Sequence, residues 1–458
     1  MKLATNTNAT YALTLDNGFG SYSSVPATYT KVAHRDSGTD TGTSATGSEL
    51  TSTYAAYMNQ TQPAGTYTGQ VKYTLVHPSN EEPLQPQPAT AGCINYFANA
   101  STSIGEMGCQ SASNNASVDL WASNFKRDGY GFAGWNDKYD YSGTNYGPNQ
   151  TITAPADVQT NGLSLYAVWI KSAGTIQNWN GCTNLTQAPT DGTATLSSVT
   201  ALTDERDSNT YAVARLADGK CWMIENLRLD NNPELSASNT HNPSLPLNNS
   251  WWYSADNDSN TIPISNHLSI TTDPAQTTWC TTDSSNCDDQ SMLATNNTTL
   301  FTGNSSASYS ASSNVYSYGN YYNWYSATAG HGKYGSNYDN GYHAPGDICP
   351  AGWHLPTGSG DTSAEYRILD TSMGGTGTSQ YIQEATNKWR SFPNNFVFSG
   401  NVSGVSIQDR GNYGKYWSST ASADNTVHSL GFHSSYVGPG RNTANKNDGR
   451  MVRCVAGV

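Results

Sequence analysis

The amino-acid sequence predicts a multidomain, β-rich chain, and three observations lead to that expectation. At 458 residues the chain is too long for a single hydrophobic core, which favours about two to four domains. Many short runs of β-favouring residues are broken by Gly, Asn and Pro, as in strands joined by turns. Tyr (29) and Trp (12) are abundant, so the low charged fraction of 12% does not indicate a disordered chain.

Residues 1–77 are expected to form the first domain. Alternating apolar residues predict strands over 11–15 and 65–76, and the Gly/Ser/Thr-rich stretch 36–49 predicts a long loop between them. The second strand resembles the last strand of many bacterial surface β-sandwiches, which implies a β-sandwich-like surface domain. Four prolines in the stretch 78–92 then favour a semi-rigid, extended linker.

Residues 93–171 carry two motifs, GYGFAGW at 129–135 and LYAVW at 165–169. Gly129 and Gly134 permit tight turns. The expected core consists of aromatic and apolar residues of the two motifs, namely Phe132, Trp135, Tyr166, Val168 and Trp169. The motif pair resembles the Listeria–Bacteroides repeat, a small β-grasp-like module of bacterial surface proteins. The resemblance implies a spacer or stalk, with direct ligand binding as the alternative.

Residues 172–458 form the third and largest expected domain. The pattern over 203–216 predicts a hairpin, and the Asp-Gly pair at 218–219 predicts a type I′ turn. The stretch 231–314 is polar and rich in Asn, Ser and Thr, which favours a long insertion or a mobile loop. The aromatic-dense run 316–325 is either a buried strand with core aromatics or a set of rings that stack on sugars.

Two short helices are expected in this third domain. The first spans 363–372, with Ser363 as the N-cap residue and Tyr366 and Leu369 toward the core. The second spans 383–390.

Three motifs of the third domain occur in a fixed order. They read YAVARLADGKCWMIENL at 211–227, CPAGWHLPT at 349–357, and YWSST at 416–420 followed by VRCV at 452–455. Together they resemble the Fibrobacter succinogenes major paralogous domain, which is similar to the C-type-lectin-like fold in the version shared with formylglycine-generating enzymes. The resemblance implies a mixed α/β domain with long irregular loops, whose sugar or protein ligands bind on a loop-covered face.

The eight cysteines favour disulfide bonds, because their number is even and no Cys-x-x-Cys pair or zinc-type spacing is present. Disulfides in turn indicate an oxidising, extracellular compartment. Reduced buried thiols are the alternative. Neighbour order suggests four pairs, although spacing alone does not decide the connectivity: Cys93–Cys109, Cys182–Cys221, Cys280–Cys287 and Cys349–Cys454.

Charge and hydropathy exclude several partner classes. A formal net charge of −13 and a pI near 5.0 argue against nucleic acid. No run of about 18 apolar residues is present, so we expect no membrane span. Residues 1–20 lack the apolar stretch of a signal peptide, and we expect a mature or trimmed chain whose anchor, if any, lies elsewhere.

We expect no enzyme and no cofactor. Formylglycine-generating enzymes depend on a pair of reactive cysteines near their C-terminus, whereas only Cys454 lies in that region here. The nine histidines show no metal-ligand spacing, and His354 is expected to be a packed structural residue. Calcium is left open at the carboxylates of Asp204, Glu205 and Asp207, and at 256–260, where Asp and Asn side chains cluster. Solvated polar turns are the competing interpretation of both clusters.

The last fifty residues give the candidate binding site. Leu430, Phe432, Val437, Val452 and Val455 read as a fixed apolar frame. The residues between them are mixed polar, charged and aromatic types of the kind found in paratopes, which suggests binding. The predicted ligand-binding residues are Lys415, Gly431, His433, Tyr436, Gly438, Gly440, Arg441, Asn442, Thr443, Asn445, Lys446, Asp448 and Arg450.

This C-terminal segment resembles the variable regions of target proteins of diversity-generating retroelements, which end in similar motifs on a lectin-like scaffold. There, adenines of Asn codons are randomised, and most non-frame residues here belong to the resulting set. Lys415 and Lys446 do not, and a fixed binding face is the alternative.

The sequence thus predicts a bacterial protein of the extracellular cell surface that acts as an adhesin or receptor. Its partner would be a protein or glycan ligand on another cell, a phage or a host. The alternative is a structural subunit of a surface layer or filament.

Overall fold

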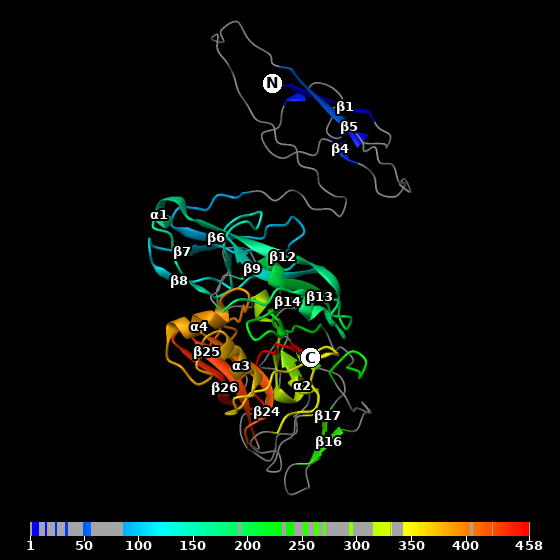
Figure 1. Cartoon of the computed structure of the whole chain (residues 1–458), viewed down its shortest axis with the longest axis vertical. Coiled ribbons are helices and arrows are strands. Elements are labelled where there is room, and N and C mark those ends of the chain that lie inside the picture. Colours follow the sequence, from blue (N-terminus) through cyan, green and yellow to red (C-terminus); the bar gives the residue numbers. More distant parts are fainter. Residues whose placement is uncertain are drawn as a thin grey trace. The chain divides into compact units, whose positions relative to one another are not determined.

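The computed structural model describes residues 86–190, 194–230, 235–241, 315–329, 331, 342–403, 406–423 and 425–457, together with the backbone of some further strands. The chain divides into two compact units, Met1–Gln85 and Pro86–Val458. This division falls inside the stretch 78–92 for which the sequence predicts a linker. The protein is β-rich, with several separate sheets and a few short helices (Figure 1).

The N-terminal unit is described only as backbone strands, and their pairing is antiparallel. The strands are β1 (Lys2–Asn8), which pairs with β3 (Ser23–Ser24) and β5 (Glu49–Ala55), and β2 (Thr14–Leu15), which pairs with β4 (Ala33–His34). The strand expected over 65–76 lies outside the described residues. A sandwich arrangement of this unit therefore stays a prediction.

A ten-stranded sheet forms the centre of the second unit, in the order β10-β9-β12-β13-β14-β15-β27-β21, with β6 paired to β12 and to β7. Its strands are β6 (Cys93–Phe97), β7 (Cys109–Ser111), β9 (Tyr130–Asn136), β10 (Asn145–Tyr146), β12 (Leu163–Thr175), β13 (Val199–Thr203), β14 (Thr210–Arg215), β15 (Cys221–Met223), β21 (Trp353–His354) and β27 (Val455–Ala456). β12 pairs with β6 and β9 along its first part and with β13 along its last part. The expected boundary after residue 171 therefore lies inside one strand, and the segments on both sides of it share this sheet.

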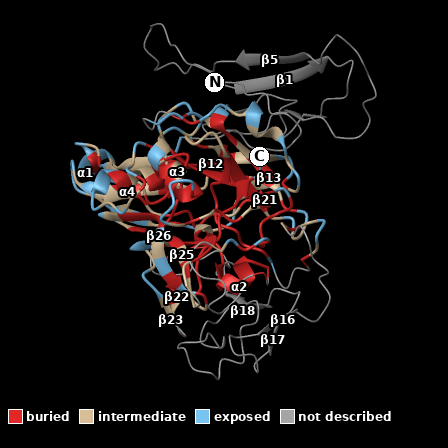
Figure 2. Cartoon of the chain, turned by 60° about the horizontal axis from the view of Figure 1, so that its bottom comes forward, coloured by how far each residue is buried: buried red, intermediate tan, exposed pale blue. Residues whose placement is uncertain are grey.

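Smaller elements surround this sheet. They are β8 (Ser117–Asp119) with β11 (Thr151–Thr153), α1 (Val158–Asn161), β20 (Tyr321–Tyr322), α2 (Trp324–Ala327), β22 (Asn401–Ser403) with β23 (Ser406–Gln408), and, as backbone only, β16 (Trp251–Ser254), β17 (Thr261–Ile264), β18 (Ser269–Thr271) and β19 (Leu293–Thr295). Figure 2 shows buried residues running through β12 and its neighbours, with exposed residues at α1.

The predicted core of the segment 93–171 is confirmed. All five expected core side chains are at least nine-tenths buried, and Phe132 and Trp135 meet edge to face at 5.0 Å. Gly129 lies in a turn with a φ angle of 77°, as predicted. The tight turn predicted at Gly134 is wrong, because this residue, with a φ angle of 132°, lies inside β9 opposite an irregularity in β12. The Cys93–Cys109 disulfide joins β6 to β7.

Buried polar contacts hold this segment against the rest of the unit. The Glu225 carboxylate accepts hydrogen bonds from the backbone N–H groups of Phe132 and Ala212 and pairs with Arg228 at 3.2 Å. A Cβ on Gly131 would lie 2.4 Å from the backbone nitrogen of Ala212, so only glycine permits this approach of β9 to β14. The segment is therefore integrated into the second unit.

The expected hairpins of the third domain are present, with one correction. β13 and β14 pair antiparallel, and β14 continues into β15 through the Asp-Gly turn. Of that pair only Gly219 has a positive φ angle, 79°, so the predicted type I′ turn is wrong. Of the stretch 231–314, the structure describes residues 235–241 and the backbone of β16, β17, β18 and β19.

Both predicted helices are found. α3 spans Glu365–Ser372 with Tyr366 and Leu369 fully buried, and α4 spans Gln383–Arg390. Ser363 is wrong as the N-cap residue, because Ala364 occupies that position without a side-chain cap. Instead Thr357 supplies the cap from the preceding loop, since its Oγ1 accepts a hydrogen bond from the Glu365 N–H at 2.9 Å.

The aromatic run 316–325 is core. Tyr318, Tyr321, Tyr322 and Trp324 are fully buried, so stacking on sugars is ruled out and their role as core aromatics is confirmed. The expected strand is wrong apart from β20, because a 3-10 turn precedes it and α2 follows it. The whole apolar frame of the C-terminal segment is also fully buried.

Three of the four expected disulfides are present, namely Cys93–Cys109, Cys182–Cys221 and Cys349–Cys454. Cys280 and Cys287 lie outside the described residues. Disulfides of this number are compatible with an extracellular protein. Within the described part of the chain, no helix is long and apolar enough to cross a membrane.

Candidate ligand-binding face

Three antiparallel strands carry most of the predicted site. They are β24 (Tyr413–Ala421), β25 (Thr426–His433) and β26 (Tyr436–Asn445), with β25 in the middle. Because side chains alternate along a strand, the inward row Gly414, Phe432 and Val437 packs on the core. The two flanking rows, Tyr413–His433–Tyr436 and Lys415–Gly431–Gly438, therefore point outward.

The first outward row forms a line of touching rings, which we call the aromatic row. The ring centroids of Tyr413 and His433 lie 4.9 Å apart, and those of His433 and Tyr436 lie 5.5 Å apart. Tyr381 extends the line, 4.9 Å from Tyr436, from the loop before α4. With 78% of its surface exposed, Tyr381 is an aromatic side chain of the kind that anchors binding partners.

Glycines in the second outward row let two side chains lie flat on the sheet. A Cβ on Gly431 would lie 2.2 Å from Asn442 Nδ2, and one on Gly438 would lie 2.4 Å from Asn442 Oδ1 and 2.5 Å from the Tyr436 hydroxyl oxygen. The Tyr436 hydroxyl donates a hydrogen bond of 2.5 Å to Asn442 Oδ1. Gly431 and Gly438 therefore form the floor of the face: they leave space for the side chains of Asn442 and Tyr436, and they have no side chains with which to contact a ligand.

A hollow of about 280 Å³, here called the basic pocket, opens beside the aromatic row. Its lining residues are Tyr413, Lys415, Gly431, Phe432, Tyr436, Asn442, Thr443 and Arg450. The Lys415 ammonium donates to Asn401 Oδ1 at 2.8 Å and pairs with Asp409 at 2.7 Å.

Arg450 lines the basic pocket and is largely buried. Its guanidinium carbon lies 5.3 Å from the centre of the Trp417 ring, and Nη2 lies 3.5 Å from Asp448 Oδ2. Burial lowers the pKa of Arg450 and the Asp448 charge raises it, with a net downward shift. Arginine stays charged at neutral pH even so.

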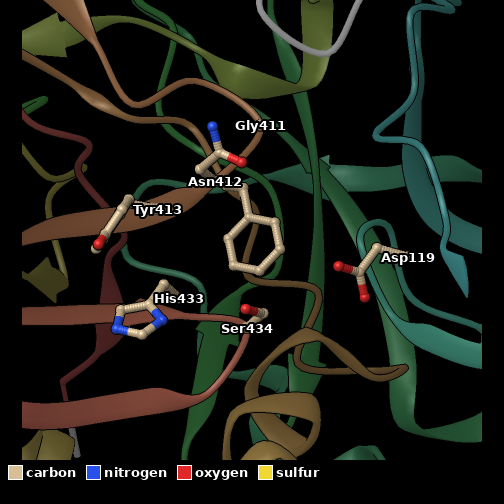
Figure 3. A pocket seen from close by; sticks show the side chains of 7 residues that line it. Asp119, Gly411, Asn412, Tyr413, His433 and Ser434 are labelled. Carbon is tan, nitrogen blue, oxygen red and sulfur yellow. The ribbon is translucent and has the colours of Figure 1, made fainter. Parts of the chain in front are cut away.

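A second hollow of about 290 Å³ has Tyr413 and His433 among its lining residues. Figure 3 shows Tyr413 and His433 at one side of it and Asp119 at the opposite side. Asp119 comes from β8, and its Oδ1 lies 3.0 Å from Arg390 Nη1. The face thus combines the C-terminal strands with a residue of the segment 93–171.

The predicted site residues separate into three groups. Arg441, Thr443 and Asn445 are exposed. Half-buried residues at the face or its edge are Lys415, His433, Tyr436, Asn442 and Asp448. The remaining five, Gly431, Gly438, Gly440, Lys446 and Arg450, are buried.

Two of the buried residues are placed away from open surface. Lys446 is 1% exposed, and its ammonium lies 4.9 Å from the centre of the Trp324 ring. Gly440 has a φ angle of 72°, and a Cβ there would meet Gly358 at 3.0 Å, so it serves chain packing. Long side chains such as Lys446 fold back over core aromatics, and sequence spacing does not reveal that choice.

Sequence reasoning missed Tyr381, Tyr413 and Asp119. Tyr413 had a signal, because it lies two residues before Lys415 on one strand and so shares its face. No sequence signal marked Tyr381 or Asp119, because both lie far from β24, β25 and β26 in the sequence and only the tertiary fold brings them to the face.

The calcium hypothesis at 204–207 is not supported by the geometry. Asp204 and Arg206 form an ion pair of 2.6 Å with fully buried side chains, so this carboxylate is not a free ligand. Glu205 lies exposed in the turn that follows, which agrees with the competing interpretation at that residue. Burial raises the pKa of Asp204 and the Arg206 charge lowers it, with a net downward shift. Among the described residues no group of three or more His, Cys, Asp and Glu side chains could hold a metal ion. The second candidate, 256–260, lies outside the described residues.

His354 is half-buried, and its Nε2 lies 2.8 Å from Glu365 Oε1, which agrees with a structural role. The described cysteines are all in disulfides.

A scan of the chain against protein-family models gave no match, and searches of curated proteins and of solved structures gave none either.

Proposed function

We propose that this chain is a bacterial cell-surface protein that binds a ligand through the outward face of β24, β25 and β26. The observation that carries the proposal is the aromatic row, which stands on a fully buried apolar frame beside the basic pocket. Exposed or half-exposed aromatic rings among polar donors, on a rigid support, are typical of recognition surfaces. No covalent step is needed for such a role.

The C-type-lectin-like fold of the domain belongs to the same proposal. It is supported by the way the three quoted motifs come together, because β14, β15, β27 and β21 are successive neighbours in one sheet. These strands carry parts of the motifs at 211–227, 452–455 and 349–357. Residues that the motifs share with the Fibrobacter succinogenes major paralogous domain thus build the support of the face.

Diversification of the face by a retroelement remains the more specific version of this proposal. It is supported by the alternation in β25 and β26 of buried frame residues with outward polar and aromatic residues. Sequencing the genomic locus tests this version. A near-copy of the DNA for about residues 410–454 beside a reverse-transcriptase gene would support diversification, and the absence of such a copy would support a fixed face. A subunit of a surface layer or filament would instead bury this face between copies.

Replacing Tyr436 and Arg441 by Ala tests the binding role. Tyr436 lies at the centre of the aromatic row, so its loss is expected to weaken binding about 30-fold, or about 2 kcal/mol. Exposed Arg441 is expected to contribute less, about three- to tenfold. The purified chain is first screened on a printed panel of glycans and surface proteins, and the affinity for each positive probe is then measured.

Tyr139→Ala and Lys171→Ala are the matched controls, because they remove a half-buried Tyr and an exposed cation from the segment 93–171. All four variants should keep the wild-type melting temperature. Equal loss of binding in the controls, or a lowered melting temperature in the Tyr436 variant, would refute the assignment.

A further inference from the structure

Three side chains with donor nitrogens line the basic pocket, and no carboxylate is among its lining residues. Donor nitrogens come from Lys415, Asn442 and Arg450, and the carboxylates that pair with the two cations, Asp409 and Asp448, are not among the residues that line it. Such an arrangement complements a group that carries several acceptor oxygens.

Arg450 is the strongest single indication. The residue is 7% exposed, and its Nε has no hydrogen-bond partner among the described residues. Nη1 reaches Ser429 Oγ at 3.3 Å, and Nη2 is 3.5 Å from Asp448 Oδ2, longer than a normal hydrogen bond. Nε itself is enclosed by the protein, so a ligand in the basic pocket can add hydrogen bonds only at the terminal nitrogens Nη1 and Nη2, whose present contacts are long.

Asn442 adds a fixed donor. Its Oδ1 is occupied by the Tyr436 hydroxyl at 2.5 Å, so the amide group is held with Nδ2 over the floor at Gly431. Lys415 uses hydrogen bonds to Asn401 and Asp409, which leaves one of its three N–H protons for a ligand.

The size and surroundings of the basic pocket favour a sugar over a peptide. Its volume of about 280 Å³ lies just below the range of about 300–1,000 Å³ that is typical of small-molecule pockets, so it has room for roughly one ring. Tyr413 and Tyr436 line it and belong to the aromatic row, on which the C–H groups of further sugar rings can pack.

We propose that the basic pocket takes the carboxylate of an acidic saccharide, such as a uronic acid residue, while neighbouring sugar rings lie along the aromatic row. This inference rests on the proposed function and specifies its ligand class. The net charge of −13 disfavours general attraction of polyanions, so any preference for the acid has to come from this local group of donors.

The test compares trigalacturonic acid with its fully methyl-esterified form, because esterification removes the negative charge and keeps the sugar rings. Isothermal titration with the full chain should give at least tenfold tighter binding of the acid at 0.15 M salt, a condition chosen to screen long-range attraction. Lys415→Met and Asn442→Ala should each weaken binding of the acid about three- to tenfold, and Lys415→Met, which removes a positive charge, should weaken the acid more than the uncharged ester. They are preferred to Arg450→Gln, since Arg450 covers Trp417 and its loss can disturb folding.

Equal binding of acid and ester would overturn the inference and leave the binding face intact. The inference would also be overturned if neither saccharide binds while another probe still binds in a way that depends on Tyr436. Acid binding that Lys415→Met and Asn442→Ala do not weaken would place the saccharide elsewhere and overturn the inference as well. If no probe of any kind depends on Tyr436, both the inference and the proposed function fail.

Discussion

Removal of the Cys349–Cys454 disulfide is expected to destabilise the second unit by about 4–5 kcal/mol. The bond closes a segment with a sequence separation of 105, and in the chain-entropy model the restriction of the unfolded chain grows with loop length. Both sulfur atoms belong to fully buried residues, so Cys349→Ala with Cys454→Ala also loses packing contacts. The free energy of unfolding by urea measures the effect.

The Cys93–Cys109 bond provides the matched control. Its sequence separation is 16, for which the same model gives about 3 kcal/mol. The double Ala variant of this pair should therefore lose less stability than the variant that lacks Cys349–Cys454. A larger loss from the short loop would contradict the idea that the long disulfide is the main constraint on the C-terminal segment.

Replacing Glu365 by Gln is expected to cost about 3 kcal/mol at neutral pH. Its Oε1 lies 2.8 Å from Lys220 Nζ and 2.8 Å from His354 Nε2, and its Oε2 accepts from the Thr357 N–H at 2.9 Å. Burial raises the pKa of Glu365, but the hydrogen bond and charge of His354 and the bond to Lys220 lower it, to about 2 in total. The shift from 4.5 to about 2 corresponds to about 3 kcal/mol.

The pH dependence makes this prediction specific. A carboxyl group whose pKa is lowered in the folded state binds fewer protons there than in the unfolded state, so its stabilisation is complete above about pH 4.5. It is lost as the pH falls toward about 2. The difference in unfolding free energy between wild type and Glu365→Gln should therefore shrink across this window. A difference that is absent at pH 7, or that stays constant down to pH 2, would contradict the assigned pKa.

The spacing of apolar residues within single strands and helices correctly predicted which of their side chains are buried. Alternation along β25 placed Leu430 and Phe432 in the core, and the apolar spacing of α3 placed Tyr366 and Leu369 there. Neighbour order of the cysteines matched the disulfides in the described residues.

Contacts between distant segments were not predictable in this way. The continuation of β12 into the sheet of the third domain has no local signal, because its last residues are polar and mostly exposed. For the same reason the sequence did not show that Tyr381 joins the aromatic row or that Asp119 lines the second hollow. Arg450 was predicted as a contact residue, but it is buried against Trp417, which lies far away in the sequence.

Mapping the segments that a bound ligand protects would show whether the ligand binds on β24, β25 and β26. Hydrogen–deuterium exchange of the full chain would be compared with and without the tightest-binding probe from the panel. If the ligand binds to the outward face, new protection from exchange should be confined to β24, β25 and β26 and to the loop that carries Tyr381. Protection at another surface, with exchange of these strands unchanged, would contradict binding at this face.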